Sequence, residues 1–547
     1  MRALYFEQIP YDAEGRKDQN SEDNTIMGAG IYIGDVFKAI LQHSAYDQIL
    51  LPAPSQRVTD SLRESRLFAE NAHRIKLVFE HELGMLKEMK HVILASPAVN
   101  FLKLIRIRRA INRPRTPITG VIHSINYSGQ IEVMLPVIFS RLHSFDAMLC
   151  SSTAGAQAVK NYIRLIGDRI EQVGLGEFRP PIKTPVIPLG VDASQFADNG
   201  RSAREWLSIQ EGVVILYFGR LSAASKADLY PLLIMHSELC RQHHNVYLVI
   251  AGDDTHFRMA KDLEDFASEL GCRSNVRVVP NPTTAQKREL YAAGDVFVSL
   301  SDSLQETFGI TLVEAMAAGL PIVASDWDGY KDLVAPGETG YLIPTLMPRY
   351  SSQVDNLYGS SNTKESDLLA STTVVDMAAL KQALVKLIVD VEHRRELGLA
   401  ARKRARDLYD WKAVIKCYEG LWEELAEEAA VAPLDLNRMG IAKWGYLDIF
   451  EHYPTAFLTN ETRVAISDLG RQWRDKSQLI SRITTSNKWF QPEELSSILD
   501  FLLAREDASL AEILAFHGSK TEGDSVRPLG HLCRLLKYGL VEKISRP

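Results

Sequence analysis

Cysteine is scarce in this chain, and long apolar runs are missing. Only 5 of the 547 residues are cysteines, they lie far apart, and no two form a CxxC pair. They are Cys150, Cys240, Cys272, Cys417 and Cys533. We expect reduced thiols rather than a disulfide framework or a zinc site. No apolar run reaches the roughly 18 residues of a membrane-spanning helix, and charge comes too early for a secretory signal. We therefore expect a cytoplasmic protein.

A strong charge of one sign is also missing. The chain has 62 Lys and Arg against 69 Asp and Glu, a net charge of -7, and 46% hydrophobic residues. This balance excludes wholesale disorder and gives no overall attraction to nucleic acid or to an anionic membrane. No Ser-His-Asp or Cys-His constellation and no cluster of metal ligands stands out. We expect no metal, no cofactor and no nucleic-acid partner.

Short apolar runs alternate with longer amphipathic stretches, which predicts parallel strands joined by helices. The first expected strands are Ala3–Tyr5, Gln48–Leu51, His91–Leu94, Gly120–His123, Ala147–Cys150 and Thr184–Ile187. The second series is Val213–Phe218, Val246–Ala251, Val276–Val279, Val296–Leu300, Ile322–Ala324 and Gly340–Ile343. The sequence thus predicts an α/β protein with two doubly wound, Rossmann-like domains, residues 1–200 and 201–405, facing a cleft.

Three further segments fall outside these two domains. Residues 346–375 are rich in Ser, Asn and Thr, which is typical of a long surface insertion. Residues 406–430 are expected to form a helix that returns to the first domain. Residues 431–547 are expected to form a mainly helical appendage, whose last part has the helix, turn, helix and strand pattern of a winged helix. The appendage has 15 basic and 15 acidic residues, so it favours a protein partner or a homo-oligomer over DNA.

The most informative stretch is Ala292–Pro344. It contains a buried strand, a polar loop and then a helix that we expect to begin near Gly309. The amides of a helix N-terminus suit a phosphate, and a glycine lets the backbone approach it closely. Glu306 lies just before this helix, and Glu314 lies inside it.

Glu306, seven intervening residues and Glu314, framed by TFGITLVEAMAAGLPIVAS, resemble the signature of retaining glycosyltransferases of family 4, which have the GT-B fold. Other segments resemble the family in the same order along the chain. They are VVILYFGRLSAASK with Arg220 and Lys226, TPVIPLGVDASQF, YLVIAGDD and GETGYLIP. The resemblance covers most of residues 1–428 and does not extend to the appendage.

The resemblance implies roles for the second domain. Arg220 and Lys226 would clamp the donor diphosphate and stabilise its charge as it leaves, as a divalent metal does in many enzymes. Glu306 would accept hydrogen bonds from the transferred sugar, and Glu314 from the ribose diol. Donor-binding backbone groups would come from Gly252, Thr307, Phe308, Gly309 and Ile310.

Two elements of the first domain are implicated in the same way. Gly28 and Gly30, before an apparent helix, resemble the family's glycine-rich loop beneath the diphosphate. His123 matches a histidine that touches the sugar from the opposite face. Each has a structural alternative, since glycines punctuate any turn and a histidine can simply end a strand.

The chain departs from the family pattern at two places. Ala227 follows Lys226 where a glycine is usual, and Asp253-Asp254 follow Gly252 where a second glycine is common. Neither departure removes a charge from the expected site. Both leave the identity of the nucleotide open, with a UDP-sugar, glucose first, as the favoured donor and the acceptor unknown.

A basic segment lies at residues 103–115. It carries Lys103, Arg106, Arg108, Arg109, Arg113 and Arg115, with no acid between Glu88 and Glu132. One interpretation is a weak contact with an anionic membrane surface or a phosphate-bearing acceptor, which would make the protein peripheral to a membrane. The favoured interpretation is a solvated helix face.

The resemblance implies a glycosyltransferase that retains the anomeric configuration, and we expect it to be metal-independent. The alternative is a non-catalytic GT-B regulator that acts through its appendage, and the intact charged set speaks against it. A third interpretation is a phosphorylase or epimerase on the same fold.

Overall fold

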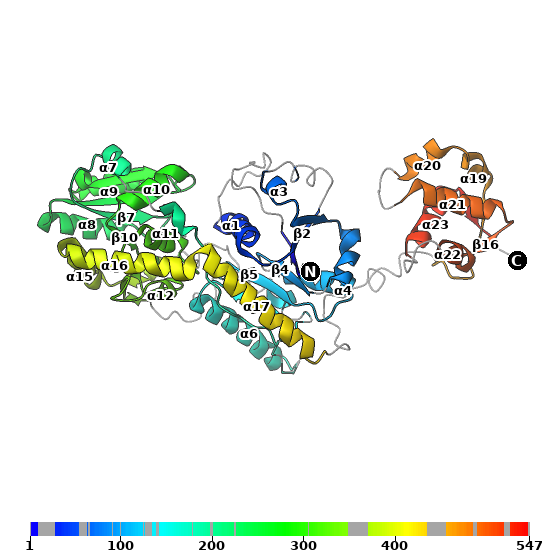
Figure 1. Ribbon diagram of the computed structural model, residues 1–547, viewed down its shortest axis with the longest axis horizontal. Coiled ribbons are helices and arrows are strands. Elements are labelled where there is room, and N and C mark those ends of the chain that lie inside the picture. The colour runs from blue at the N-terminus through cyan, green and yellow to red at the C-terminus, as the bar shows by residue number, and fades with distance from the viewer. Residues whose placement is uncertain are drawn as a thin grey trace. The chain divides into compact units, whose positions relative to one another are not determined.

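A computed structural model describes most of the chain. The described residues are 2–8, 28–53, 63, 66–89, 91–98, 100–123, 125, 134–137, 140, 142–174, 176–177, 179–196, 201–223, 226–304, 306–347, 370–434, 456–484, 490–518 and 526–544. They form two compact units, Met1–Lys443 and Trp444–Pro547. The first unit contains two lobes, each built on its own parallel sheet (Figure 1).

The first lobe is a six-stranded parallel sheet in the order β3-β2-β1-β4-β5-β6. Its strands are β1 (Arg2–Phe6), β2 (Gln48–Pro52), β3 (Ile75–Val78), β4 (His91–Ser96), β5 (Ile118–Ile122) and β6 (Ala147–Cys150). Its helices are α1 (Gly28–His43), α3 (Arg66–Glu70), a 3-10 helix (Glu80–Glu88), α4 (Phe101–Ala110) and α6 (Thr153–Gln172). Strands β4, β5 and β6 are apolar and buried on both faces, because helices cover the sheet.

One expected strand of this lobe is wrong. Thr184–Ile187 does not form a strand, and the sixth place in the sheet belongs to β3. Residues 183 and 186 make only isolated bridges to β6. The reason is that Pro185 has no N–H to continue the ladder. β3 escaped prediction because it is a half-exposed edge strand interrupted by Lys76.

The second lobe repeats the same winding. Its sheet has the order β12-β11-β10-β7-β8-β9, and all six expected strands are present. They are β7 (Val213–Phe218), β8 (Val246–Gly252), β9 (Val276–Pro280), β10 (Val296–Ser299), β11 (Ile322–Ser325) and β12 (Gly340–Ile343). Its helices are α7 (Arg201–Trp206), α8 (Tyr230–Gln242), α9 (Ala260–Glu269), α10 (Thr284–Ala293), α11 (Ile310–Ala318), α12 (Tyr330–Leu333), α15 (Met377–Val389) and α16 (Val391–Arg404). The lobe also has short 3-10 turns at Ala193–Phe196 and Arg273–Asn275 and the antiparallel pair of β13 (Thr345–Leu346) and β14 (Val374–Val375).

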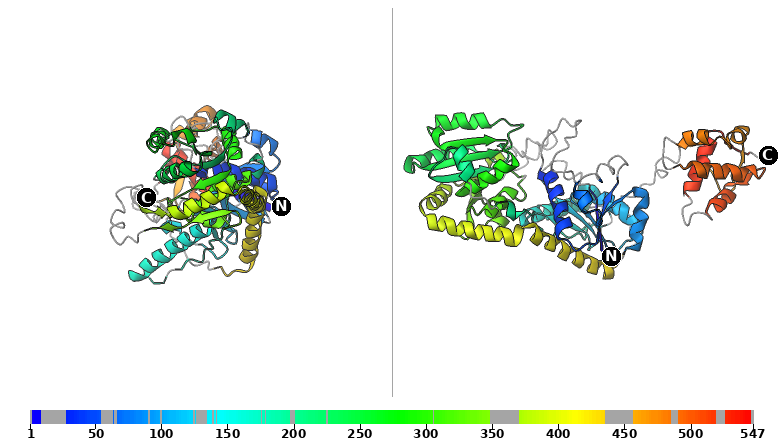
Figure 2. Two further views of the ribbon diagram at one scale, coloured as in Figure 1. Left: turned by 90° about the vertical axis from the view of Figure 1, so that its left-hand side faces the viewer. Right: turned by 45° about the horizontal axis from the view of Figure 1, so that its top comes forward.

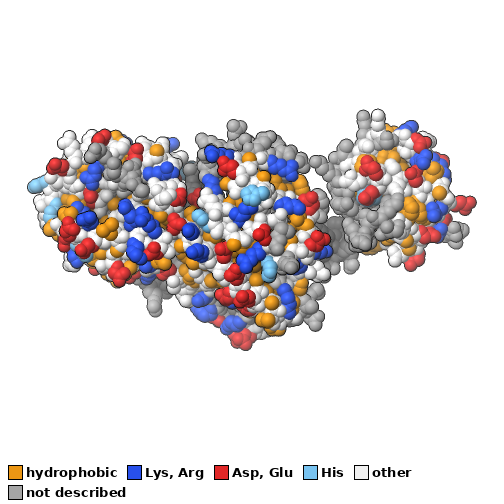
Figure 3. All heavy atoms as spheres, in the orientation of Figure 1, with side chains coloured by type: hydrophobic (Ala, Val, Ile, Leu, Met, Phe, Trp, Pro, Cys, Tyr) orange, Lys and Arg blue, Asp and Glu red, His pale blue; other side chains and the backbone are white. Residues whose placement is uncertain are grey.

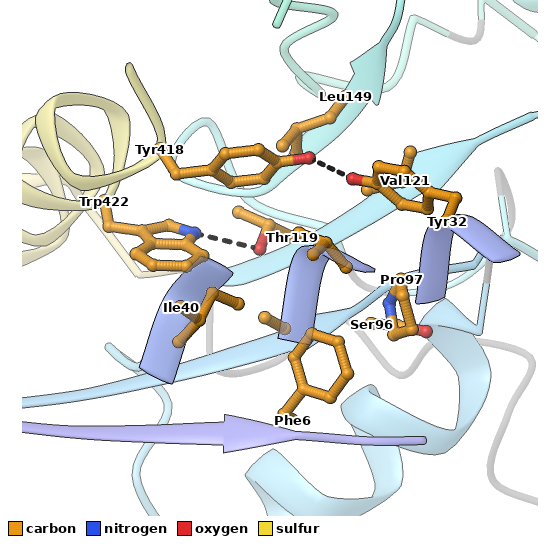
Figure 4. Close-up of a pocket in the computed structure, with 12 residues that line it drawn as sticks. Phe6, Tyr32, Ile40, Ser96, Pro97, Thr119, Val121, Leu149, Tyr418 and Trp422 are labelled. Atoms are coloured by element: carbon orange, nitrogen blue, oxygen red, sulfur yellow. Dashed lines mark hydrogen bonds between the residues drawn. The ribbon is translucent and has the colours of Figure 1, made fainter. Parts of the chain in front are cut away.

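Helix α17 (Trp411–Val431) follows a π-helical turn at Ala405–Tyr409 and packs against the first lobe, as the right-hand view of Figure 2 shows. The side chains of Trp422 and Tyr418 enter the core between α1 and the sheet (Figure 4). The indole N–H of Trp422 donates to the Thr119 hydroxyl at 3.2 Å, and the hydroxyls of Tyr418 and Tyr32 lie 2.5 Å apart. The void beside them is only about 10 Å³, so the helix is closely fitted to this lobe.

The C-terminal unit is mainly helical with a small antiparallel sheet in the order β16-β15-β17. Its elements are β15 (Arg463–Ile466), α19 (Asp468–Trp473), α20 (Ser477–Thr484), α21 (Pro492–Leu503), β16 (Ala508–Ser509), α22 (Leu510–Gly518), α23 (Val526–Lys537) and β17 (Val541–Lys543). It has its own core, in which Leu499, Ile513 and Leu535 are fully buried. On the face that Figure 3 shows, acidic and basic side chains are interspersed over this unit.

The sequence also led to expectations about a surface insertion and about membrane-spanning helices. Most of the expected surface insertion, residues 348–369, lies outside the described residues. Among the helices that the structure does describe, none is both long and apolar enough to cross a membrane.

Candidate active site

The expected donor-site residues lie beyond the carboxyl ends of the central strands of the second sheet. Strands β7 and β10 are neighbours where the strand order reverses. Doubly wound domains bind their ligands outside the carboxyl ends of the strands at such a point. The loop with Arg220 and Lys226 follows β7, and the loop with Glu306 follows β10. The fold therefore brings the two loops to one edge of the sheet.

Lys226 and Glu306 form an ion pair across these two loops. Their side chains are only 13% and 11% exposed, so each charge has little water around it and is balanced by the other. The Ser301 hydroxyl donates to the Lys226 carbonyl at 2.8 Å and ties the loops together.

The loop after β7 is shaped by its contacts with strand β8. The amide of Leu221 donates to the Asp253 carbonyl at 2.9 Å, and the half-buried Arg220 lies beside it. Gly252 at the end of β8 has φ +148°, and a Cβ there would lie 1.6 Å from the Gly219 carbonyl oxygen. Only glycine permits this approach. Asp253 and Asp254, which follow Gly252 where the family often has a second glycine, leave this close approach of Gly252 to Gly219 intact.

Helix α11 begins where the sequence predicts it. Gly309 caps its N-terminus with φ +102°, and a Cβ there would lie 2.4 Å from the Tyr330 ring. Phe308 is buried, whereas Ile310 is half-buried. The first amides of α11 thus lie beside Glu306 and supply the positive end of a helix dipole to this edge.

Glu314 is held by two residues that the sequence did not single out. The Tyr291 hydroxyl donates to one carboxylate oxygen at 2.9 Å, and the Lys287 ammonium lies 2.5 Å from the other. Lys287 and Tyr291 come from α10 at a spacing of four, which places them on one face of that helix. The spacing of four residues between Lys287 and Tyr291 was the one sign in the sequence that both side chains could contact the same group.

His123 lies just after β5, on the first lobe. Its Nε2 is 2.7 Å from the Pro97 carbonyl, which can only accept, so Nε2 carries the proton. Burial lowers the pKa of His123, which keeps the ring neutral near pH 7. The edge of the ring packs against Tyr32, with the ring centres 4.7 Å apart.

Thr307 connects His123 to the donor loop. Its hydroxyl donates to the His123 carbonyl at 2.9 Å, and its carbonyl lies 3.3 Å from the Ser151 hydroxyl. The amide of Thr153 on the first lobe also lies 2.5 Å from the Asp332 carboxylate on the second. The two lobes are therefore in direct contact next to the expected site.

Two acids near this edge, the buried Asp302 and the half-buried Asp328, were not predicted. Burial raises the pKa of Asp302 to about 7, against the opposing effect of backbone hydrogen bonds. Burial and the nearby Glu306 charge raise the pKa of Asp328 to about 7. Both follow carboxyl ends of strands, β10 and β11, where polar residues are functional candidates.

The expected glycine-rich loop has a different local structure. The helix begins at Gly28 itself, so Gly28 and Gly30 lie in the first turn of α1 rather than before it. Their neighbours 9–27 lie outside the described residues. Within the part of the chain that the structure covers, no group of three or more His, Cys, Asp or Glu is arranged to hold a metal ion.

Two Rossmann-like lobes in contact, with charged loops at the switch point of the second, define the GT-B architecture. The crystal structure of Anabaena Alr3699/HepE in complex with UDP has this fold. It is 16% identical to the chain with a TM-score of 0.50, and the match covers 78% of this chain and all of that one. At this identity the likeness shows the fold alone.

Sequence comparison finds similarity to known glycosyltransferases over part of the chain. Residues 200–357 match the family described as Glycosyl transferases group 1. The chain is 28% identical over 258 residues to the D-inositol 3-phosphate glycosyltransferase of Geodermatophilus obscurus, covering 46% of this chain and 50% of the relative. It is 29% identical over 244 residues to the phosphatidyl-myo-inositol mannosyltransferase of Mycobacterium tuberculosis, covering 45% and 55%. The chain thus spans about half the length of the curated relatives it matches.

Proposed function

We propose that this chain transfers a sugar from a nucleotide diphosphate sugar to an acceptor hydroxyl. The observation that carries the proposal is the Lys226–Glu306 ion pair beside the N-terminus of α11, at the switch point of the second sheet. One cation, one carboxylate and a row of amides meet there. The cation and the amides can bind a diphosphate, and the carboxylate can bind sugar hydroxyls.

Donor binding would exchange the partners of Lys226. In the structure the ammonium is bound to Glu306. A diphosphate placed at the α11 amides would take over Lys226 and Arg220, and Glu306 would become available to the sugar hydroxyls. The released carboxylate then keeps hydrogen-bond donors, because sugar hydroxyls replace the ammonium.

The ribose would be read at Glu314. Its carboxylate is oriented by Tyr291 and Lys287, so it can accept from a ribose diol without rearranging its own side chain. His123 would contact the sugar from the first lobe as a neutral ring whose Nδ1 can accept.

We propose that the anomeric configuration is retained. The bond between the sugar C1 and the diphosphate oxygen breaks with its electron pair, and the acceptor oxygen bonds to C1 on the same face. The departing phosphate oxygen takes the acceptor proton. Arg220 and Lys226 stabilise the charge that develops on the diphosphate, the role that a metal would otherwise have. An inverted product, seen by NMR of the anomeric proton, would overturn this proposal.

The relatives suggest what the substrates are. UDP is bound by the Anabaena structure, and the two curated relatives are named for D-inositol 3-phosphate and phosphatidyl-myo-inositol acceptors. We therefore propose a UDP-sugar donor, with glucose first, and a cyclic polyol hydroxyl of the inositol type as acceptor. Donors are best screened first by thermal shift, because a bound ligand raises the apparent stability by mass action.

An assay of nucleotide diphosphate release distinguishes the proposed transferase from a non-catalytic regulator. The protein should release nucleotide diphosphate from the donor that stabilises it, and release should persist in EDTA. Loss in EDTA that magnesium or manganese restores would overturn metal independence. Binding of donor without transfer or hydrolysis would favour the non-catalytic regulator instead.

A further inference from the structure

The turn after strand β11 packs directly against the loop between β10 and α11. The indole N–H of Trp327 donates to the Ser303 carbonyl at 2.9 Å. A Cβ added to Gly329 would lie 2.4 Å from the Thr307 carbonyl oxygen, so the two backbones are in close contact there. Asp328 lies between these two contacts, and it is therefore held next to the loop that carries the proposed sugar-binding carboxylate.

The backbone of Asp328 is strained. Its φ is +38°, in the left-handed region that few residues other than glycine adopt. Asparagine or glycine would tolerate this φ at least as well and would add no negative charge beside Glu306. The turn itself therefore does not require a carboxyl group, and strain of this kind is often kept at ligand-binding sites.

The Asp328 carboxyl has no cation of its own. It is half-buried, and among the described residues no Lys or Arg nitrogen lies within ion-pair distance of it. Lys226 is paired with Glu306. Lys331 lies 4.0 Å from Asp326 instead. A carboxyl that is partly removed from water and has no cation is costly to keep ionised.

The groups around Asp328 act on its protonation. Burial raises the pKa of Asp328 to about 7, and the charges of Glu306 and Asp332 add to this effect. The Gly329 amide and the Lys331 ammonium oppose it. Near neutral pH the carboxyl is therefore partly protonated, and it can donate a hydrogen bond as well as accept one.

We propose that Asp328 binds a hydroxyl of the transferred sugar, beside the hydroxyl that Glu306 would bind, and helps to select which sugar is transferred. The inference rests on the proposed transferase function. A sugar hydroxyl can donate to the ionised carboxyl or accept from the protonated one, so it provides the partner that the fold does not supply.

Selection of the sugar follows from the cost of an unpaired carboxyl. A site that is built to hydrogen-bond a hydroxyl rejects a sugar that lacks this hydroxyl or directs it elsewhere, because the polar group of the protein is then left unpaired. Lys226 cannot make this distinction, since the diphosphate that it would bind is common to all such donors. Asp328 should therefore affect the affinity for the sugar and leave the affinity for the nucleotide unchanged.

Calorimetric titrations of the full chain with UDP-glucose and with UDP test this role. Asp328→Gly removes the carboxyl and permits the same φ. We expect it to weaken UDP-glucose binding roughly tenfold or more, as loss of a charged hydrogen bond does, and to leave UDP binding within about twofold. Asp326→Asn is the matched control, because Asp326 is a 45% exposed carboxyl of the same turn, and it should bind both ligands as the unchanged protein does.

The ratio of the two affinities separates a sugar contact from a structural role. Equal weakening of UDP-glucose and UDP binding in Asp328→Gly would mean that the carboxyl only shapes the neighbouring loop. Unchanged binding of both ligands would mean that the carboxyl touches neither. Each of these results would overturn the proposal.

Melting temperatures provide a second measurement, which needs no ligand. Asp328→Asn keeps the size of the side chain and cannot ionise. Because the folded pKa is raised, the unchanged protein loses stability as pH rises through about 7, so the melting temperature of the variant relative to it should rise between about pH 5 and about pH 8. A variant that melts below the unchanged protein at about pH 8 would show that the carboxyl stabilises the fold, which would also overturn the proposal.

Failure of the transferase assignment would look different. If the unchanged protein binds UDP-glucose but never releases UDP, the assignment as a transferase fails, whereas the sugar contact of Asp328 is still measured by the two titrations. If it binds neither ligand, the proposed UDP-sugar donor is wrong, and the melting temperatures decide whether the carboxyl serves the fold or a ligand.

Discussion

The charge of Lys226 is the most direct test of the donor site at the scale of single residues. Replacing Lys226 by Ala removes the cation that balances Glu306 and that would hold the diphosphate. We expect turnover to fall roughly 100-fold or more, the usual cost of losing a preorganised charge. Steady-state kinetics would measure it, with Lys331→Ala as the control. Lys331 is 53% exposed, lies 4.0 Å from Asp326 and should leave turnover unchanged.

Near-normal turnover in Lys226→Ala and in Arg220→Ala would show that the diphosphate binds elsewhere. Melting temperatures of all variants should be measured alongside, because Lys226→Ala leaves Glu306 as an unpaired, nearly buried charge. A destabilised but folded protein is the expected result.

Asp302 should make stability depend on pH. It is 6% exposed, and one of its carboxylate oxygens has no hydrogen-bond partner among the described residues. Its folded pKa of about 7 lies above the usual value, so the folded protein binds the proton more tightly than the unfolded chain does. The contribution of Asp302 to stability is therefore present below about pH 4 and is lost as pH rises to about 7.

The Asp302→Asn variant has no carboxyl to ionise at this position, so it should not lose stability in this way as pH rises. Its melting temperature relative to the unchanged protein should rise between pH 4.5 and 7.5 and then stay level. Asp326→Asn is the control for loss of a carboxyl at the end of the neighbouring strand β11, because Asp326 is 45% exposed. A difference for Asp302→Asn that does not vary with pH would mean that this carboxyl titrates normally.

At the scale of elements, the start of α11 depends on one glycine. Gly309 has φ +102°, and an added Cβ would meet the Tyr330 ring at 2.4 Å. Gly309→Ala should lower stability by about 1–3 kcal/mol and weaken donor binding, because the strained turn carries the α11 amides. Thermal unfolding and a donor titration would measure both effects.

Gly420→Ala is the matched control in the middle of α17. A Cβ there meets no atom within 4 Å, and alanine favours the helix. We expect a slightly raised melting temperature and unchanged donor binding. If Gly309→Ala behaved in the same way, the amino end of α11 would not be shaped by this turn.

At the scale of the whole molecule, the end of α17 decides where the chain can be cut. Ala429 and Ala432 are buried in the core of the first lobe, and Arg115 binds their carbonyls. The first compact unit continues to Lys443. A chain ending at Lys443 should therefore fold, bind donor and release diphosphate, whereas one ending before Trp411 should not be stable.

The C-terminal unit should then prove dispensable for the donor reaction. It has a separate core, and the proposed donor-site residues lie in the first unit. Light scattering and the acceptor assay on the chain ending at Lys443 should show a changed oligomeric state or loss of activity on the natural acceptor. Loss of donor binding would place the unit in the catalytic core.

Much of this architecture follows from local pattern. Buried parallel strands are short, apolar and β-branched, so all six strands of the second sheet could be read from the sequence. The start of α11 followed from Gly309, because only a residue that tolerates positive φ fits there. The same pattern gave a wrong prediction for Thr184–Ile187, because Pro185 has no N–H to donate to the strand ladder. It also missed β3, because this half-exposed edge strand has only a weak apolar pattern.

What the sequence by itself determined was the two strand–helix series, the helix that follows Gly309 and the residue types placed at the ends of the strands. Only the tertiary structure decided which charges meet. Lys226 reaches Glu306 across two loops, Lys287 reaches Glu314 across two helices, and Arg108 pairs with the buried Asp146. The physical reason is that these pairs join residues 27 to 80 positions apart. Periodicity reports only the face of an element, and partners at that separation are chosen by the packing of the sheets.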